Sequence, residues 1–214
     1  MNSRLPFFDA DSATRLENAR HPYPVVSLFS GAMGLDLGLN EAGLRVAVSQ
    51  DMDKWCIETM RRNSHLAIDG DIPQQMRSHP RCKFFPGPSG GPRERRLALV
   101  GGPPCQPFST AGKRKGVEDA RGQLYQEFIK VVSALRPRFF IMENVKGLAS
   151  MPCDPADKQS KPVLDTILES FKAIGYHTVH GILDAVHYGT PEFRERLVIV
   201  GSRDGEDVFL PGAS

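Results

Sequence analysis

The stretch that most constrains this chain is residues 97–109, Leu-Ala-Leu-Val-Gly-Gly-Pro-Pro-Cys-Gln-Pro-Phe-Ser. Its apolar first half predicts a short buried strand, which two glycines and two prolines then end abruptly. Pro103 and Pro104 fix two φ angles and lack an N–H, so the backbone before Cys105 is stiff. This break predicts a thiol nucleophile at the carboxyl end of a strand, where ligands bind in open α/β sheets. The alternative is that Cys105 is an ordinary buried thiol.

The composition predicts one ordinary globular domain. The 214 residues are 40% hydrophobic and 24% charged, which suffices for a single sizeable core. Neither a membrane-span window nor a signal-peptide pattern is present, so we expect a cytoplasmic protein with no membrane partner. The four cysteines lack paired spacing, which indicates neither a zinc site nor a disulfide framework. A net charge of +2 permits a nucleic-acid partner without requiring one.

The hydrophobic pattern alternates between strands and helices. We expect strands at residues 25–29, 45–50, 66–68, 97–100, 138–142, 176–185 and 196–201, and helices at 35–44, 54–62, 123–135 and 163–174. This order predicts an α/β fold with a doubly wound, mostly parallel sheet and helices on both faces. The domain would occupy residues 25–203, between an N-terminal leader at 1–24 and a tail at 204–214.

A glycine turn and two later carboxylates predict a cofactor site. Residues 29–34, Phe-Ser-Gly-Ala-Met-Gly, join a strand to a helix, a layout that points backbone N–H groups at a polar ligand; the alternative is a tight connection only. Asp51 follows the second strand, about twenty residues later, where it can accept hydrogen bonds from ribose hydroxyls. Asp53 is expected to cap the next helix. Asp71 follows the third strand and offers a further carboxylate.

Charged residues at two later strand ends complete the candidate site. Glu143 follows the strand expected at 138–142. Alternation would place Arg194 and Arg196 on one side of an extended strand, and the alternative is a charged, solvent-exposed edge. Residues 106–122 carry cations between glycines and are a candidate lid over the site.

These motifs together resemble the DNA cytosine-5 methyltransferases. Gly101 to Ser109 resembles the family's nucleophile motif, and the other motifs follow in the family's order: Phe29-Ser30-Gly31, Asp51, Asp71, Glu143-Asn144-Val145 and Arg194-x-Arg196. The resemblance implies a Rossmann-like methyltransferase that uses S-adenosyl-L-methionine, releases S-adenosyl-L-homocysteine, needs no metal and acts on double-stranded DNA, as in restriction-modification systems.

The resemblance also implies roles for individual residues. The implied cofactor-binding residues are Phe29, Ser30, Gly31, Gly34, Asp51, Met52, Asp71, Ile72 and Pro103. The implied catalytic residues are Cys105, Glu143, Arg194 and Arg196. Cys105 would form a covalent adduct with a flipped-out cytosine while Glu143 protonates the ring, and the two arginines would hold the base and the backbone phosphates.

Three substitutions and the chain end depart from the family pattern. Met33 replaces a glycine and could crowd the cofactor, Asp51 replaces a glutamate, and Glu192 replaces a glutamine. The family's target-recognition domain and final motifs do not follow before Ser214. We therefore expect a truncated, split or degenerate enzyme, with a second chain as a possible source of recognition and little activity alone. The alternative functions are a transfer-RNA cytosine-5 methyltransferase and a non-catalytic cofactor- or DNA-binding relative.

Overall fold

The computed structural model describes residues 24–72, 98–104, 124–154, 156–157 and 159–212. The chain divides into two compact units, each described by itself. The first unit comprises Met1–Gly101 and Val131–Arg138, and the second comprises Gly102–Lys130 and Phe139–Ser214. The expected leader lies outside the described residues except for Pro24, which begins the first strand, and the lid residues 106–122 and Cys105 also lie outside them.

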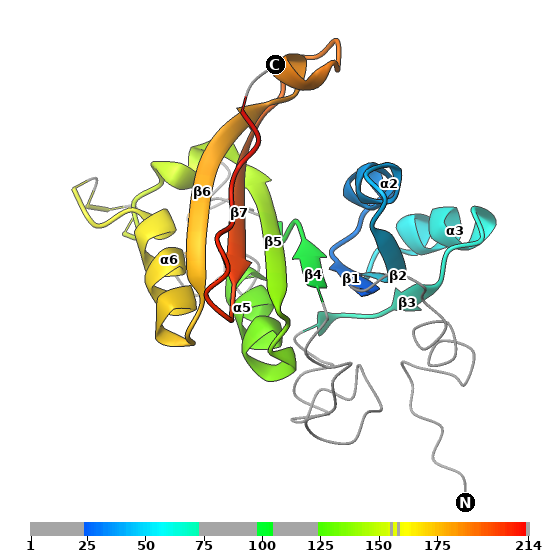
Figure 1. Cartoon of the computed structure of the whole chain (residues 1–214), viewed down its shortest axis with the longest axis horizontal. Coiled ribbons are helices and arrows are strands. Elements are labelled where there is room, and N and C mark those ends of the chain that lie inside the picture. The colour runs from blue at the N-terminus through cyan, green and yellow to red at the C-terminus, as the bar shows by residue number, and fades with distance from the viewer. Residues whose placement is uncertain (1–23, 73–97, 105–123, 155, 158, 213–214) are drawn as a thin grey trace, which may run out of the picture. The chain divides into compact units, whose positions relative to one another are not determined.

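The first unit is built on parallel strands in the order β3-β2-β1-β4 (Figure 1). Its strands are β1 (Pro24–Leu28), β2 (Arg45–Asp51), β3 (Ala67–Asp69) and β4 (Ala98–Gly101), and its helices are α2 (Gly34–Glu41) and α3 (Lys54–Arg62). Four of the five residues of β1 are fully buried, as expected for a central strand covered on both faces.

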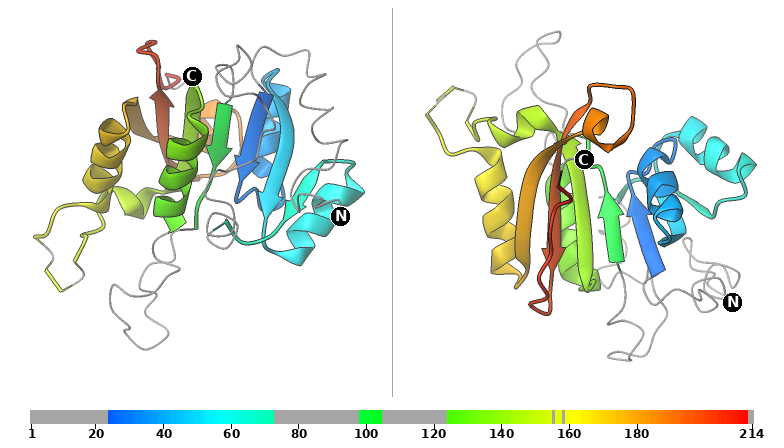
Figure 2. Two further views of the ribbon diagram at one scale, coloured as in Figure 1. Left: turned by 90° about the horizontal axis from the view of Figure 1, so that it is seen from below. Right: turned by 45° about the horizontal axis from the view of Figure 1, so that its top comes forward.

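The second unit is built on antiparallel strands in the order β5-β7-β6. Its elements are β5 (Phe139–Val145), η3 (Lys146–Ala149), α6 (Val163–Ala173), β6 (His177–Asp184), η4 (Ala185–Tyr188) and β7 (Glu195–Ser202). Helix α5 (Leu124–Leu135) begins in this unit and ends in the first. Figure 2 shows α5 and α6 on one side of these strands.

An aromatic cluster forms the core of the second unit. Phe140 is fully buried, stacks on Phe171 of α6 at 4.1 Å between ring centroids, and meets Phe128 of α5 edge-on at 6.1 Å. Because alternate residues of β5 face the helices, Met142 and Asn144 are also buried while Glu143 faces the other side. The core thus fixes the direction in which Glu143 points.

The predicted α/β fold with a mostly parallel sheet is confirmed. The predicted helices and strands of the described ranges lie within a few residues of the observed ones. One difference matters for the site: β5 continues through Glu143 to Val145, because β7 pairs with it along that whole length. Within the described ranges, no helix is long and apolar enough to cross a bilayer.

Candidate active site

The glycine turn follows β1 and has an unusual backbone conformation. It comprises residues 29–33, because Gly34 already belongs to α2. Phe29, Gly31 and Met33 have left-handed φ values of 53°, 55° and 71°. Hydrogen bonds to β2 hold the turn: the Ser30 N–H donates to the Gln50 carbonyl at 3.0 Å, and the Phe29 N–H to the Gln50 side-chain oxygen at 3.3 Å. Gln50 also donates to the Gly70 carbonyl at 2.5 Å, so it links the turn to the residue before Asp71. No motif in the sequence indicated this role of Gln50, which follows from its place at the end of β2.

The carboxylate of Asp51 is fastened to the same turn. Its Oδ2 accepts the Gly31 N–H at 2.8 Å, while Oδ1 accepts the N–H groups of Met52 and Asp53 at 2.7 and 2.9 Å. Asp53 caps α3 by accepting from Trp55 and Cys56 at 2.8 and 3.1 Å, as predicted, and these bonds lower its pKa. The two aspartates therefore have different roles: Asp53 caps the helix, and Asp51 binds the turn.

The surroundings of the turn fit a nucleoside-type cofactor. A Cβ atom added at Gly31 or Gly34 would have no other atom within 4 Å, so the turn borders open space. Beside Asp51, the side chains of Met52 and Trp55 are each 66% exposed, which offers apolar surface next to a hydrogen-bonding carboxylate. Asp71 is partly exposed after β3, whereas Ile72 is buried.

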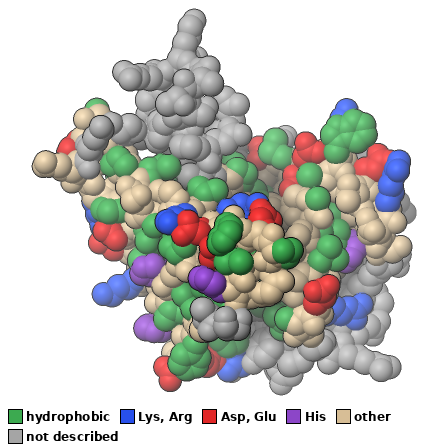
Figure 3. Space-filling view, turned by 90° about the horizontal axis from the view of Figure 1, so that it is seen from above, with side chains coloured by type: hydrophobic (Ala, Val, Ile, Leu, Met, Phe, Trp, Pro, Cys, Tyr) green, Lys and Arg blue, Asp and Glu red, His purple; other side chains and the backbone are tan. Residues whose placement is uncertain are grey.

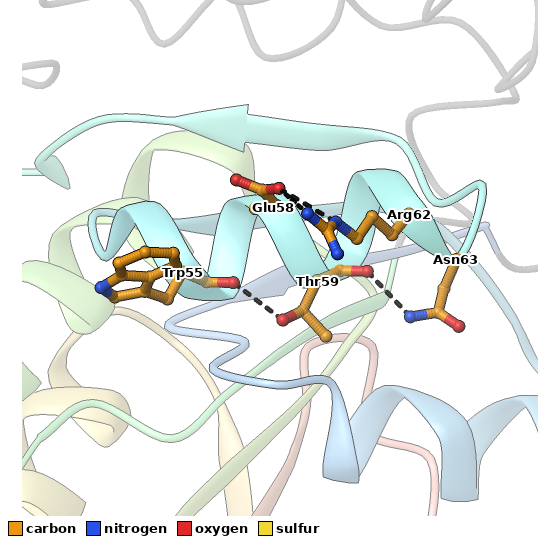
Figure 4. Close-up of polar contacts among 5 residues, drawn as sticks. All are labelled: Trp55, Glu58, Thr59, Arg62 and Asn63. Atoms are coloured by element: carbon orange, nitrogen blue, oxygen red, sulfur yellow. Dashed lines mark hydrogen bonds and ion pairs between the residues drawn. The ribbon is translucent and has the colours of Figure 1, made fainter.

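Helix α3, which follows Asp51, is braced along its outer face (Figure 4). The Thr59 hydroxyl donates to the Trp55 carbonyl and the Asn63 amide to the Thr59 carbonyl, both at 2.8 Å. Arg62 donates through Nε to Glu58 at 2.9 Å, an exposed pair that adds a few tenths of a kcal/mol, roughly. These contacts are typical of a solvated helix surface and add no ligand-binding group.

The sequence suggested that the Met33 side chain could crowd the cofactor, but the structure buries this side chain against α3. Its side chain is 2% exposed and packs in an apolar cluster with Ile57 and Met60 of α3. The left-handed φ of Met33 is unfavourable for a residue with a Cβ atom. Burial of the thioether offsets that cost, so Met33 anchors the end of the turn to α3.

Met33→Gly is expected to destabilise the chain by roughly 1–3 kcal/mol, even though glycine suits the backbone. The lost burial of a large side chain outweighs the relief at one left-handed position. Urea unfolding measures the change, with exposed Met52→Gly as the matched control. A Met33→Gly variant as stable as the wild type would show that the cluster contributes nothing to holding the turn.

The charged part of the site lies in the second unit. Arg196 of β7 donates through Nε to Oε1 of Glu143 at 2.7 Å, and both side chains are about two-thirds buried or more. A Cβ atom on Gly102 would lie 3.0 Å from Oε2 of Glu143. Gly102 does not have a left-handed φ, so its backbone conformation does not require a glycine. The lack of a side chain at this position instead leaves room for the Glu143 carboxylate. Glu143 is thus held between Arg196 and the segment that leads to Cys105.

Asn144 fastens that segment to the same strand. Its buried side-chain amide donates to the Pro103 carbonyl at 2.9 Å, and its oxygen accepts the Val145 N–H at 2.9 Å. Pro103 itself is buried, whereas Pro104 is exposed. Neighbouring residues of β5 therefore hold both the carboxyl group and the backbone two residues before Cys105.

The structure places one of the two arginines, Arg196, in a strand. Strand β7 begins at Glu195, so Arg194 precedes it, and the Arg194 N–H donates to Asp184 at 2.8 Å. Its side chain pairs with Glu192 at 3.5 Å, an exposed contact, while Arg196 meets Glu143. The departure Glu192 therefore neutralises Arg194 rather than the more buried Arg196.

Opposite charges alternate around this part of the surface. Lys146 pairs with Glu195 at 2.6 Å, next to the Glu143–Arg196 pair. In Figure 3 the basic side chains likewise lie beside acidic ones on the face shown, without one large basic patch. Among the described residues, no three His, Cys, Asp or Glu side chains group as metal ligands.

Comparison with known proteins decides the family. A family model described as C-5 cytosine-specific DNA methylase matches residues 23–212. The chain belongs to this family. One relative is the type II methyltransferase M.AquIA of Picosynechococcus, which is 39% identical to this methylase over 87% of the chain and 75% of its own length. M.NgoFVII of Neisseria gonorrhoeae, also a type II methyltransferase, is 35% identical over 89% of the chain and 46% of its own length.

A solved structure supports the fold of this methylase. The Dnmt2 methyltransferase of S. pombe matches with a TM-score of 0.63 at 21% identity, over 87% of this chain and 52% of that one. Apart from M.AquIA, the chain thus spans about half the length of these relatives.

Proposed function

We propose that this chain transfers a methyl group from S-adenosyl-L-methionine to carbon 5 of cytosine in double-stranded DNA. The observation that carries the proposal is the Glu143–Arg196 pair set against Gly102, with Asn144 holding Pro103, two residues before Cys105 in the sequence. Family membership and the similarity to named type II DNA methyltransferases support it.

The reaction needs a nucleophile and an acid because carbon 5 of cytosine is a poor nucleophile. Addition of the Cys105 thiolate to carbon 6 makes the ring an enamine, whose carbon 5 can accept the methyl group. Glu143 protonates ring nitrogen 3 and so removes the negative charge that the addition creates. Loss of the carbon 5 proton to a base then expels the thiolate, and the nitrogen 3 proton returns to Glu143, which restores both the aromatic ring and the acid.

Arg196 in β7 and Arg194 just before this strand assist the reaction. Arg196 already holds Glu143 through Nε and, as a forked donor, can also hold the cytosine oxygen. Arg194 is half-exposed and can reach backbone phosphates once it leaves Glu192. The base must be flipped out of the helix, because its carbon 6 cannot be attacked inside a stacked duplex.

The first unit would hold the cofactor. Asp51 would accept hydrogen bonds from ribose hydroxyls, Asp71 and Ile72 would bound the adenine, and Met52 would pack on it. Phe29, Ser30 and Gly31 of the turn, with Gly34 at the start of α2, would line the amino-acid end. S-adenosyl-L-methionine supplies an electrophilic methyl group on a sulfonium.

DNA containing 5-fluorocytosine tests the nucleophile, because fluorine at carbon 5 blocks the last step and traps the adduct. We expect a denaturation-resistant complex with the wild type in the presence of S-adenosyl-L-methionine, and none with Cys105→Ser. Cys153→Ser, which removes an exposed thiol, is the matched control and should keep the complex. Adduct formation with transfer RNA alone would favour the RNA enzyme, and no adduct with either would favour a non-catalytic relative.

A further inference from the structure

A buried carboxyl group that the proposed mechanism does not use lies beneath the glycine turn. Asp36, in the first turn of α2, is 0% exposed. Its Oδ1 accepts the Ser27 hydroxyl of β1 at 2.5 Å, and its Oδ2 accepts the Ser49 hydroxyl of β2 at 2.6 Å. One carboxyl group therefore ties α2 to two neighbouring strands.

Only one of the two serines connects Asp36 to the turn. The Ser30 hydroxyl donates to the Ser27 oxygen at 2.8 Å, and Ser27 in turn donates to Asp36. Because the Ser27 proton is committed to Asp36, its oxygen is left as an acceptor for Ser30. Ser49 instead joins Asp36 to β2, whose next residue, Gln50, holds the turn through separate hydrogen bonds to backbone N–H groups.

The turn needs this support. Phe29 and Met33 are left-handed residues with side chains, and each such residue costs roughly 1–3 kcal/mol. A conformation of this kind persists only where the surrounding contacts determine it. Ser30 follows Phe29 directly, its carbonyl accepts the Met33 N–H at 2.9 Å, and its side chain joins the relay.

The buried carboxyl group is itself costly. Burial raises the pKa of Asp36, and the hydroxyls of Ser27 and Ser49, the charge of His65 and the hydroxyl of Ser30 oppose that rise. Hydrophobic packing could join α2 to β1 and β2 without removing a polar group from water. What packing cannot do is orient two hydroxyl groups toward a fixed point.

We propose that Asp36 is a positioning residue for the cofactor, which acts through Ser27 and Ser30 to hold residues 29–33 in the conformation that receives S-adenosyl-L-methionine. The statement about the turn stands on the contacts alone. The statement about the cofactor rests on the proposed function.

Two serine variants separate positioning from general stability. Ser27→Ala and Ser49→Ala each remove one hydroxyl from Asp36, but only Ser27→Ala breaks the relay to Ser30. Amide hydrogen exchange of Ser30, Gly31 and Met33, whose N–H groups are bonded within the turn or to β2, reports the turn without any cofactor. We expect at least tenfold faster exchange at these three amides in Ser27→Ala, and under threefold in Ser49→Ala.

Calorimetric titration with S-adenosyl-L-homocysteine then tests the cofactor. We expect about tenfold weaker binding by Ser27→Ala and by Asp36→Asn, and binding within twofold of the wild type by Ser49→Ala. Equal effects of the two serine variants on turn exchange would overturn the proposal, since a merely structural carboxyl group predicts that result. A wild type that does not bind S-adenosyl-L-homocysteine would count against the proposed function, while the exchange comparison would still decide the role of Asp36.

Discussion

Replacing Glu143 by glutamine is expected to slow methyl transfer to DNA by about 10²- to 10⁴-fold while the fold stays intact. Glutamine has the same shape, so it can still accept from Arg196 and fit against Gly102. It cannot give a proton to ring nitrogen 3, and the negative charge of the adduct would remain on the ring. The effect therefore falls on the chemical step.

Single-turnover transfer of tritiated methyl groups, with enzyme in excess over DNA, measures this rate even when turnover is slow. Glu195→Gln is the matched control, because Glu195 adjoins Arg196 but pairs with Lys146 at the surface. We expect the control to stay within threefold of the wild type. If Glu143→Gln keeps more than a third of the wild-type rate, Glu143 is not the proton donor.

The local elements were predictable from the sequence because their signals are local. Asp53 was assigned to the α3 cap and is found there, since an aspartate before an amphipathic run is a strong helix-start signal. The antiparallel direction of β7 was not predicted, because strand periodicity carries no direction. The length of the connection could have indicated that direction. Only ten residues separate β6 from β7, whereas a crossover between two parallel strands needs a dozen or more residues.

The polar parts of the site were less predictable. Asp36 was missed because an acid in a first helical turn is explained by the helix dipole alone. Its signal was the polar Ser27 within the apolar run of β1 and Ser49 at the end of the apolar run of β2, since a core tolerates such groups only with buried partners. Arg194 and Arg196 look equivalent by alternation, and the position at which β7 begins separates them. The role of Cys105 stays a prediction.

The second large effect is on stability: Gly201→Ala is expected to lower the free energy of unfolding by about 3 kcal/mol. A Cβ atom at Gly201 of β7 would lie 2.0 Å from the Phe140 ring. The ring cannot move aside easily, because Phe171 stacks on it and Tyr176 lies 5.3 Å away between centroids. The added methyl group must therefore displace β7 from the core.

Gly181→Ala is the matched control for this clash, since it is also a strand glycine of the second unit. Its Cβ atom would meet a terminal methyl group of Leu210 at 2.6 Å, and Leu210 is a half-buried, flexible side chain that can rotate away. We expect a loss below about 1 kcal/mol for this variant, since only a flexible side chain must shift. Urea unfolding of both variants measures the difference, and equal losses would mean that Phe140 is not held as rigidly as its contacts imply.

Gly201→Ala should also weaken the contact between Arg196 and Glu143, because Arg196 lies in β7, the strand that the added methyl group displaces. A crystal structure of the variant would then show a distance longer than 2.7 Å between Arg196 Nε and Glu143 Oε1.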